Sequence, residues 1–147
     1  MAVKLQTASI DHILLRGEFP GFQPITLFEH WITPALITKW WADEAEIEAR
    51  QGGSYHLTFN KGQWHLRGTY TDYQPGEALA FTWKWDHEPQ LPEREVVVNF
   101  TPQEKGSLLT LWQGTYGDTD PELQDRQSHI DGWQHFLQRL EQMAVGG

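Results

Sequence analysis

Residues 119–140 read TDPELQDRQSHIDGWQHFLQRL, and this stretch decides the fold. Thr119 or Asp120 suits the N-cap of a helix, Pro121 suits its first turn, and Glu122 adds a favourable negative charge there. An apolar stripe follows at helical spacing, formed by His129, Ile130, Trp133, Phe136, Leu137 and Leu140. The stretch therefore predicts one long amphipathic helix, which needs a large apolar surface on which to bury its stripe.

The sequence before this helix has the alternation of strands and supplies that surface. Strands are predicted at Glu44–Glu48, Ser54–Phe59, Trp64–Tyr73, Leu79–Trp85, Glu93–Thr101 and Ser107–Gln113. Turn residues separate them at Gly52-Gly53, Asn60-Lys61-Gly62, Pro75-Gly76 and Glu104-Lys105-Gly106, and a longer loop is expected at Asp86–Pro92. Because the connections are short, neighbouring strands should pair as an antiparallel meander.

The first part of the chain adds one strand and two short helices. Ser9–Phe19 is predicted as a strand, and Pro24 begins a helix that runs to about Ile32. Thr33 as N-cap and Pro34 at the first helical position predict a second helix, ending near Trp40-Trp41. The expected fold is therefore α+β, a helix-grip fold in which a curved antiparallel sheet of about seven strands surrounds the C-terminal helix. The whole chain, 1–147, is expected to form a single domain.

Composition excludes several classes of function. The net charge of −9 argues against a nucleic-acid-binding surface and against an anionic membrane face. The absence of cysteine excludes disulfides, thiolate metal sites and a cysteine nucleophile. Residues 1–6 lack a secretory signal pattern and no apolar run is long enough for membrane insertion, so a cytoplasmic location is expected.

Six short motifs resemble those of a known family. They are Trp40-Trp41, GGSY at 52–55, GTYTDYQP at 68–75, LAFTW at 79–83, GSLLTL at 106–111 and HIDGW at 129–133. In this order they resemble the SRPBCC (START-like) superfamily, and within it the group named for the C-terminal domain of the activator of the heat-shock-protein-90 ATPase. The resemblance implies the helix-grip fold. It also implies one of several activities, because relatives include hydrophobic-ligand carriers, polyketide cyclases and co-chaperone domains.

A ligand-binding cavity is expected between the last helix and the sheet. The predicted ligand contacts are Tyr55, Leu57, Tyr70, Phe81, Trp83, Val98, Leu111, Gln113, His129, Trp133 and Phe136. Gln113 stands where many relatives carry His, and the family register places it on the cavity side of its strand. The aromatic members can either line a cavity or form ordinary core, because both surfaces coincide in this architecture.

Two residues carry open alternatives, and two more have an expected position at the cavity. His129 either orients a ligand or anchors the helix by hydrogen bonds, and the anchoring role is favoured. Gly132 either permits close contact between helix and sheet or leaves room for a ligand, and close contact is slightly favoured. Trp40 and Trp41 are expected to cap the end of the cavity, with one of them near the surface.

No catalytic residue, metal site or cofactor is predicted. His129 and His135 lie about 240° apart around the helix and cannot share an ion. His56 and His65 can face each other across adjacent strands, but no carboxylate at ligand spacing joins them. There is also no Gly-x-Ser-x-Gly motif for a serine nucleophile.

The leading hypothesis is a non-catalytic module that binds a small apolar or aromatic molecule. The second is a cyclase- or hydrolase-like enzyme that uses the same cavity, with His129 as general acid or base. The third is a protein-interaction module of the co-chaperone kind, in which Trp112 and His65 lie on the exposed face of the sheet. A homodimer is compatible with each of them.

Overall fold

The computed structural model describes residues 3–6 and 9–146 of the chain. The predicted domain of 1–147 therefore includes five residues, 1–2, 7–8 and 147, that lie outside the described part. In chain order the elements are β1 (Lys4–Leu5), β2 (His12–Pro20), α1 (Pro24–Ile32), α2 (Pro34–Ile37), β3 (Glu44–Ile47), β4 (Ser54–Phe59), β5 (Trp64–Gln74), β6 (Ala78–Trp85), β7 (Arg94–Gln103), β8 (Gly106–Gly114) and α3 (Asp120–Gly146).

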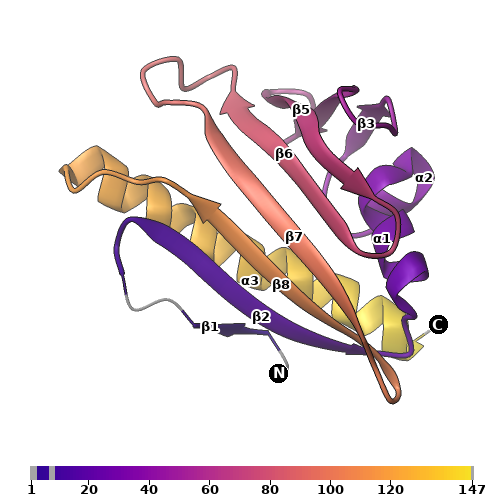
Figure 1. Cartoon of the computed structure of the whole chain (residues 1–147). Coiled ribbons are helices and arrows are strands. Elements are labelled where there is room, and N and C mark those ends of the chain that lie inside the picture. The colour runs from indigo at the N-terminus through magenta and orange to yellow at the C-terminus, as the bar shows by residue number, and fades with distance from the viewer. Residues whose placement is uncertain (1–2, 7–8, 147) are drawn as a thin grey trace.

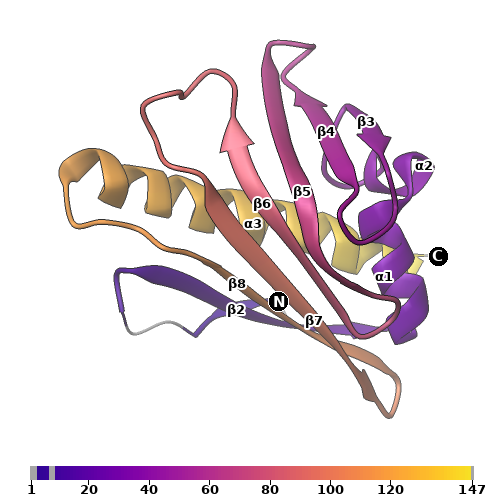
Figure 2. The ribbon, with the colours of Figure 1, turned by 45° about the horizontal axis from the view of Figure 1, so that its top comes forward.

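The strands form one open antiparallel sheet with the order β1-β2-β8-β7-β6-β5-β4-β3. β3 to β8 follow one another as a meander, and β2 joins the sheet beside the last strand, β8. The pairing of β5 with β6 shifts register between Tyr70 and Asp72, which is a place of added twist. The predicted α+β helix-grip fold is confirmed, and α3 runs along one face of the twisted sheet (Figures 1 and 2).

Two features at the start of the chain differ from the prediction. β2 begins at His12 rather than at Ser9, because the Ser9 hydroxyl donates a 2.6 Å hydrogen bond to the Asp11 carboxylate and residues 9–11 form a turn. The sheet also has one strand more than the seven predicted. This strand, β1, pairs with β2 at Lys4 with Arg16 and at Leu5 with Leu15. A strand of two residues is too short for alternation to predict it.

The second short helix is shorter than predicted. Thr33 is its N-cap and Pro34 its first residue, as expected, but α2 ends at Ile37 and the chain continues in turns to Trp41. The Trp40 indole donates a 2.9 Å hydrogen bond to the His30 carbonyl, which holds this turn against α1. Both Trp40 and Trp41 are buried, so the expectation that one of them lies near the surface was wrong.

α3 buries its apolar stripe on the inner face of the sheet. Ile130, Trp133, Leu137 and Leu140 are all buried, as are the inward-facing Val96 and Val98 of β7 and Leu109 and Leu111 of β8. Each such side chain contributes roughly 1.5–3 kcal/mol when it is fully removed from water. α1 and α2 cover the end of the sheet beside the C-terminal half of α3, which leaves the N-terminal half of α3 facing the β6–β7 loop (Figures 1 and 2).

Gly68 in β5 is required by packing across the sheet. A Cβ atom at this position would lie 2.0 Å from the Thr82 carbonyl oxygen and 2.5 Å from the Tyr55 ring. The Tyr55 hydroxyl donates a hydrogen bond to that same carbonyl oxygen. The glycine therefore allows an aromatic ring of β4 to cross over β5 and reach β6.

Candidate functional site: an aromatic groove beside the last helix

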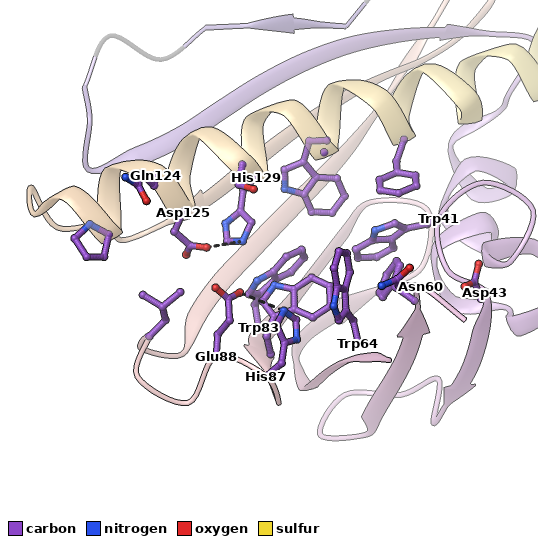
Figure 3. Close-up of a pocket in the computed structure, with 18 of the residues that line it drawn as sticks. Trp41, Asp43, Asn60, Trp64, Trp83, His87, Glu88, Gln124, Asp125 and His129 are labelled. Carbon is purple, nitrogen blue, oxygen red and sulfur yellow. Dashed lines mark ion pairs between the residues drawn. The ribbon is translucent and has the colours of Figure 1, made fainter. Parts of the chain in front are cut away.

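A groove of about 760 Å³ lies between α3 and the ends of β4, β5 and β6 (Figure 3). The β6–β7 loop forms its rim through His87, Glu88, Gln90 and Leu91. Its apolar surface comes from seven aromatic side chains, Trp41, Phe59, Trp64, Trp83, Trp85, Trp133 and Phe136. We call this feature the aromatic groove, and its size falls in the range of small-molecule sites.

Trp83 lies at the centre of the aromatic surface. Its ring centroid lies 6.0 Å from that of Trp41 in a stacked arrangement, 5.6 Å from Trp133 and 5.7 Å from Trp85. The rings come from β6, α3 and the segment after α2, so the groove exists only in the folded chain. Contacts among the rings hold each one in place, which gives a ligand a preformed surface.

Gly132 on α3 opens the wall of the groove. It is one of the lining residues, and a Cβ atom built at this position would meet nothing within 4 Å. Close contact between helix and sheet was the slightly favoured interpretation of this glycine, and it was wrong. The missing side chain leaves free space on the groove side of α3, one residue before Trp133.

A cluster of charged side chains lies at the end of the groove that is formed by the N-terminal part of α3. Arg94 of β7 pairs with Glu122 at 2.6 Å and with Asp125 at 2.8 Å, and its guanidinium lies 4.1 Å from the centre of the Tyr116 ring. The Arg94 side chain is only 1% exposed. Its hydrogen bond holds the pKa of the Glu122 carboxyl below its ordinary value. With His129, these residues form what we call the Arg94 cluster, which ties α3 to β7 and to the segment after β8.

Both ring nitrogens of His129 have partners within this cluster. Nδ1 lies 2.7 Å from the Tyr116 hydroxyl and Nε2 lies 3.4 Å from the Asp125 carboxylate. A lone pair on Nε2 would face the negative Asp125 carboxylate, so we assign the proton of the neutral ring to Nε2, and Nδ1 accepts from the phenol. Burial raises the pKa of Tyr116, so the phenol keeps its proton.

The His129 ring is neutral at physiological pH. Burial lowers its pKa to about 4, and the attraction of Asp125 opposes this only in part. An imidazole whose two nitrogens are both engaged has no free lone pair for a substrate proton. The geometry therefore favours the anchoring role of His129 over the role of general acid or base.

The predicted ligand contacts fall into two groups. Trp83, His129, Trp133 and Phe136 line the aromatic groove. The other seven do not line it and lie in the core, where all are buried: Tyr55, Leu57, Tyr70, Phe81, Val98, Leu111 and Gln113.

Gln113 acts on the groove through Trp133. Its side-chain oxygen accepts a 2.7 Å hydrogen bond from the Trp133 indole, while its amide nitrogen has no hydrogen-bond partner among the described residues. Gln113 is fully buried and fixes the orientation of a ring that forms the groove wall. Its position explains why a polar residue occurs at the inward-facing end of β8.

Sequence reasoning missed two parts of the site. The rim loop itself was expected at Asp86–Pro92, but Trp64 carries no periodic signal that places it beside α3. Arg94 does carry one, because it alternates with the inward-facing Val96, Val98 and Phe100 of β7. Asp125, His129 and Trp133 follow at intervals of four on α3, so an inward-pointing arginine and an inward-pointing carboxylate could have been paired.

The side chains considered for a metal site and for a protein contact have partners within the chain. His56 Nε2 lies 2.8 Å from His65 Nδ1, and the two are diagonal neighbours across the pairing of β4 with β5, where His56 lies opposite Arg67. Trp112 stacks on His12 with ring centroids 6.1 Å apart. Within residues 3–6 and 9–146, no group of three or more His, Cys, Asp or Glu side chains is arranged to hold a metal ion.

Fold and site together define a helix-grip protein with an aromatic groove beside its last helix. The chain matches the family described as activator of Hsp90 ATPase homolog 1-like protein over residues 22–144, and it belongs to that family. Proteins of this fold commonly bind hydrophobic ligands. No match is found among curated proteins.

Solved structures share the fold at low sequence identity. A protein of Rhodobacter sphaeroides is similar with a TM-score of 0.77 and 20% identity, covering 98% of each chain. CV1439 of Chromobacterium violaceum gives 0.76 and 24%, covering 92% of this chain and 98% of its own. CalU16 of Micromonospora echinospora gives 0.73 and 20%, covering 97% and 83%. In the part of the chain that the structure describes, no helix has the length and apolar character to cross a bilayer.

Proposed function

We propose that the protein binds a small apolar or aromatic molecule in the aromatic groove. The observation that carries this proposal is a groove of about 760 Å³ with seven aromatic side chains on its surface and an open wall at Gly132. Trp41, Phe59, Trp83 and Trp133 are each at most 8% exposed, so the apolar surface still beside water comes mainly from the other three rings, Trp64, Trp85 and Phe136. Apolar surface beside water costs free energy, and a flat ligand that covers it recovers that cost. The family resemblance supports the same conclusion, since relatives of this fold commonly bind hydrophobic ligands.

Trp64 adds a specific reason to expect a ligand. Its side chain is 46% exposed although it is a large aromatic residue at the start of β5. The ring stacks on His87 of the rim loop with centroids 5.4 Å apart and an interplanar angle of 20°. This pair forms a flat surface at the mouth of the groove, of the kind on which an aromatic ligand can stack.

Substitution at Gly132 tests the proposal without disturbing the core. Gly132→Leu places an apolar side chain in the free space of the groove, whereas the matched variant Gly132→Ala adds only a methyl group. Tryptophan fluorescence is titrated with a panel of fatty acids, polyphenols and aromatic amines for the three proteins. We expect a saturable change for at least one ligand in the unmodified protein, little loss in Gly132→Ala, and at least about tenfold weaker binding in Gly132→Leu.

Far-UV circular dichroism of each variant serves as the control for folding. If no ligand of the panel gives a saturable change, or if Gly132→Leu binds as tightly as the unmodified protein, the proposal fails. Native mass spectrometry of the protein purified from its own host gives an independent check, because a resident ligand adds a defined mass.

A further inference from the structure

We propose that the groove selects a cationic ligand, namely a small aromatic molecule that carries an ammonium group, and that Glu88 and Asp125 receive the charge. This inference rests on the proposed function and names the class of ligand. Figure 3 shows Glu88 on the rim loop and Asp125 on α3 pointing toward each other across the groove. Both residues line the groove, and they also line a smaller hollow beside it.

The charges on the groove surface are predominantly negative. Asp43, Glu88 and Asp125 line it, and among the described residues Arg139 is the one Lys or Arg in the lining. The guanidinium of Arg139 lies 3.4 Å from the backbone carbonyl of Lys39, which places it at the opposite end of the groove from Glu88. With a net charge of −9, the whole chain also attracts cations from solution.

The nearby cations leave this negative charge only partly balanced. Arg94 is shared between Glu122 and Asp125, so one positive charge faces two carboxylates. The Lys84 ammonium is bound by backbone carbonyls of the rim loop, including that of Pro89 at 3.2 Å and that of Leu91. Lys84 thus shapes the loop, and its charge is directed at carbonyl oxygens.

Glu88 is the carboxylate that most needs a partner. Its ion pair is with His87 at 3.7 Å, a residue that is charged only when protonated. Burial, and then repulsion from Asp125, raise the pKa of Glu88, while His87, Arg94 and Lys84 oppose this shift only in part. An ammonium group placed between the two carboxylates would relieve their repulsion and favour the ionised form of Glu88.

The aromatic rings beside Glu88 suit a cation as well. Trp64 and Trp85 both lie close to His87, with ring centroids 5.4 Å and 5.2 Å from the imidazole. Indole faces attract ammonium groups, and the attraction is strongest where water is partly excluded. A protonated amine near the rim loop can therefore use carboxylates and indole faces together, while its aromatic part covers Trp83 and Trp133.

Three probes of the same size test the charge preference: 1-naphthylmethylammonium, the neutral 1-naphthylmethanol and the anionic 1-naphthoate. Isothermal titration calorimetry at low ionic strength measures the dissociation constant of each. We expect the ammonium to bind about tenfold more tightly than the alcohol, with naphthoate the weakest. The preference should shrink in high salt, because screening weakens the attraction.

Glu88→Gln removes the proposed anchor at nearly constant shape. We expect it to reduce the preference for ammonium over alcohol to about threefold or less. The matched control is Glu104→Gln, which makes the same change of charge at an exposed position in the β7–β8 turn, at the far end of the sheet (Figure 1). This control should leave the preference unchanged.

The outcomes separate this inference from the proposed function. If the alcohol binds as tightly as the ammonium, or if Glu88→Gln keeps the full preference, the charge inference is overturned. Loss of alcohol binding in Gly132→Leu would in that case still support the groove as a binding site. If none of the three probes binds while a ligand of the fluorescence panel does, the charge inference alone fails; if neither set binds, both proposals fail.

Discussion

Two glycines, Gly132 and Gly68, carry opposite predictions at the scale of single residues. Gly132→Ala should raise the free energy of unfolding by about 1 kcal/mol, because alanine favours the helix and its methyl group meets no atom. Gly68→Ala should destabilise the protein, because its methyl group would overlap the Thr82 carbonyl oxygen. Urea denaturation of both variants measures the two effects. A destabilised Gly132→Ala would contradict the free space assigned beside α3.

Arg94 carries a second prediction at this scale. Arg94→Met leaves the buried Asp125 and the partly buried Glu122 without their cation, and we expect a loss of about 3–5 kcal/mol in the free energy of unfolding. Arg67→Met is the matched control, because the Arg67–Asp86 pair lies at 3.0 Å on the surface and its side chains are 52% and 42% exposed. That pair should contribute less than about 1 kcal/mol. Equal losses in the two variants would show that the Arg94 cluster is not a structural clamp.

At the scale of secondary-structure elements, the contacts of His129 that attach α3 predict that the free energy of unfolding depends on pH. His129 has a pKa of about 4 in the folded protein, below its ordinary value of 6.5, so between these values the unfolded chain binds more protons. Stability is therefore unaffected by this group above pH 6.5 and falls as the pH drops toward 4. The shift corresponds to roughly 3 kcal/mol.

His129→Gln separates this effect from the carboxylates of the same cluster. Glu122 also loses its favourable pairing with Arg94 when it is protonated. The free energy of unfolding should therefore fall in acid for the unmodified protein and for the His129→Gln variant. The difference in unfolding free energy between the unmodified protein and the variant should nevertheless narrow as the pH falls from 6.5 to 4, because only the unmodified protein loses the contribution of His129. Thermal melts across this range measure it, and a constant difference would contradict the assigned neutral state of His129.

Element bounds were predictable where the signal is local. Glycine and proline turns fixed the ends of β4 to β8 to within one or two residues, and Thr33-Pro34 fixed the start of α2. The end of α2 was not predictable, because a contact from the Trp40 indole to the His30 carbonyl of α1 holds the turn that follows it. The turn before β2 was not predictable either, because the sequence around Ser9 and Asp11 is compatible both with a turn and with the start of a strand.

At the scale of the whole molecule, alternation identified the inner face of the sheet, but it did not show which residues of that face line the groove and which pack elsewhere in the core. Tyr55, Phe81 and Val98 point inward as predicted and are buried away from the groove, whereas Trp83, which is also buried, forms part of the groove wall. The division depends on where α1, α2 and the N-terminal half of α3 lie over the sheet, and on the position of the rim loop. These are tertiary contacts, and no period in the sequence encodes them.

Five of the eight tryptophans line the groove, and this provides the most direct test of ligand binding there. Each indole N–H gives its own signal in a ¹H–¹⁵N correlation spectrum, and single Trp→Phe variants assign the signals. On titration with 1-naphthylmethylammonium, the signals of Trp64, Trp83, Trp85 and Trp133 should shift together and saturate. That of Trp112, stacked on His12 away from the groove, should stay fixed. Shifts confined to Trp112, or no saturable shift at the groove tryptophans, would contradict a binding site beside the last helix.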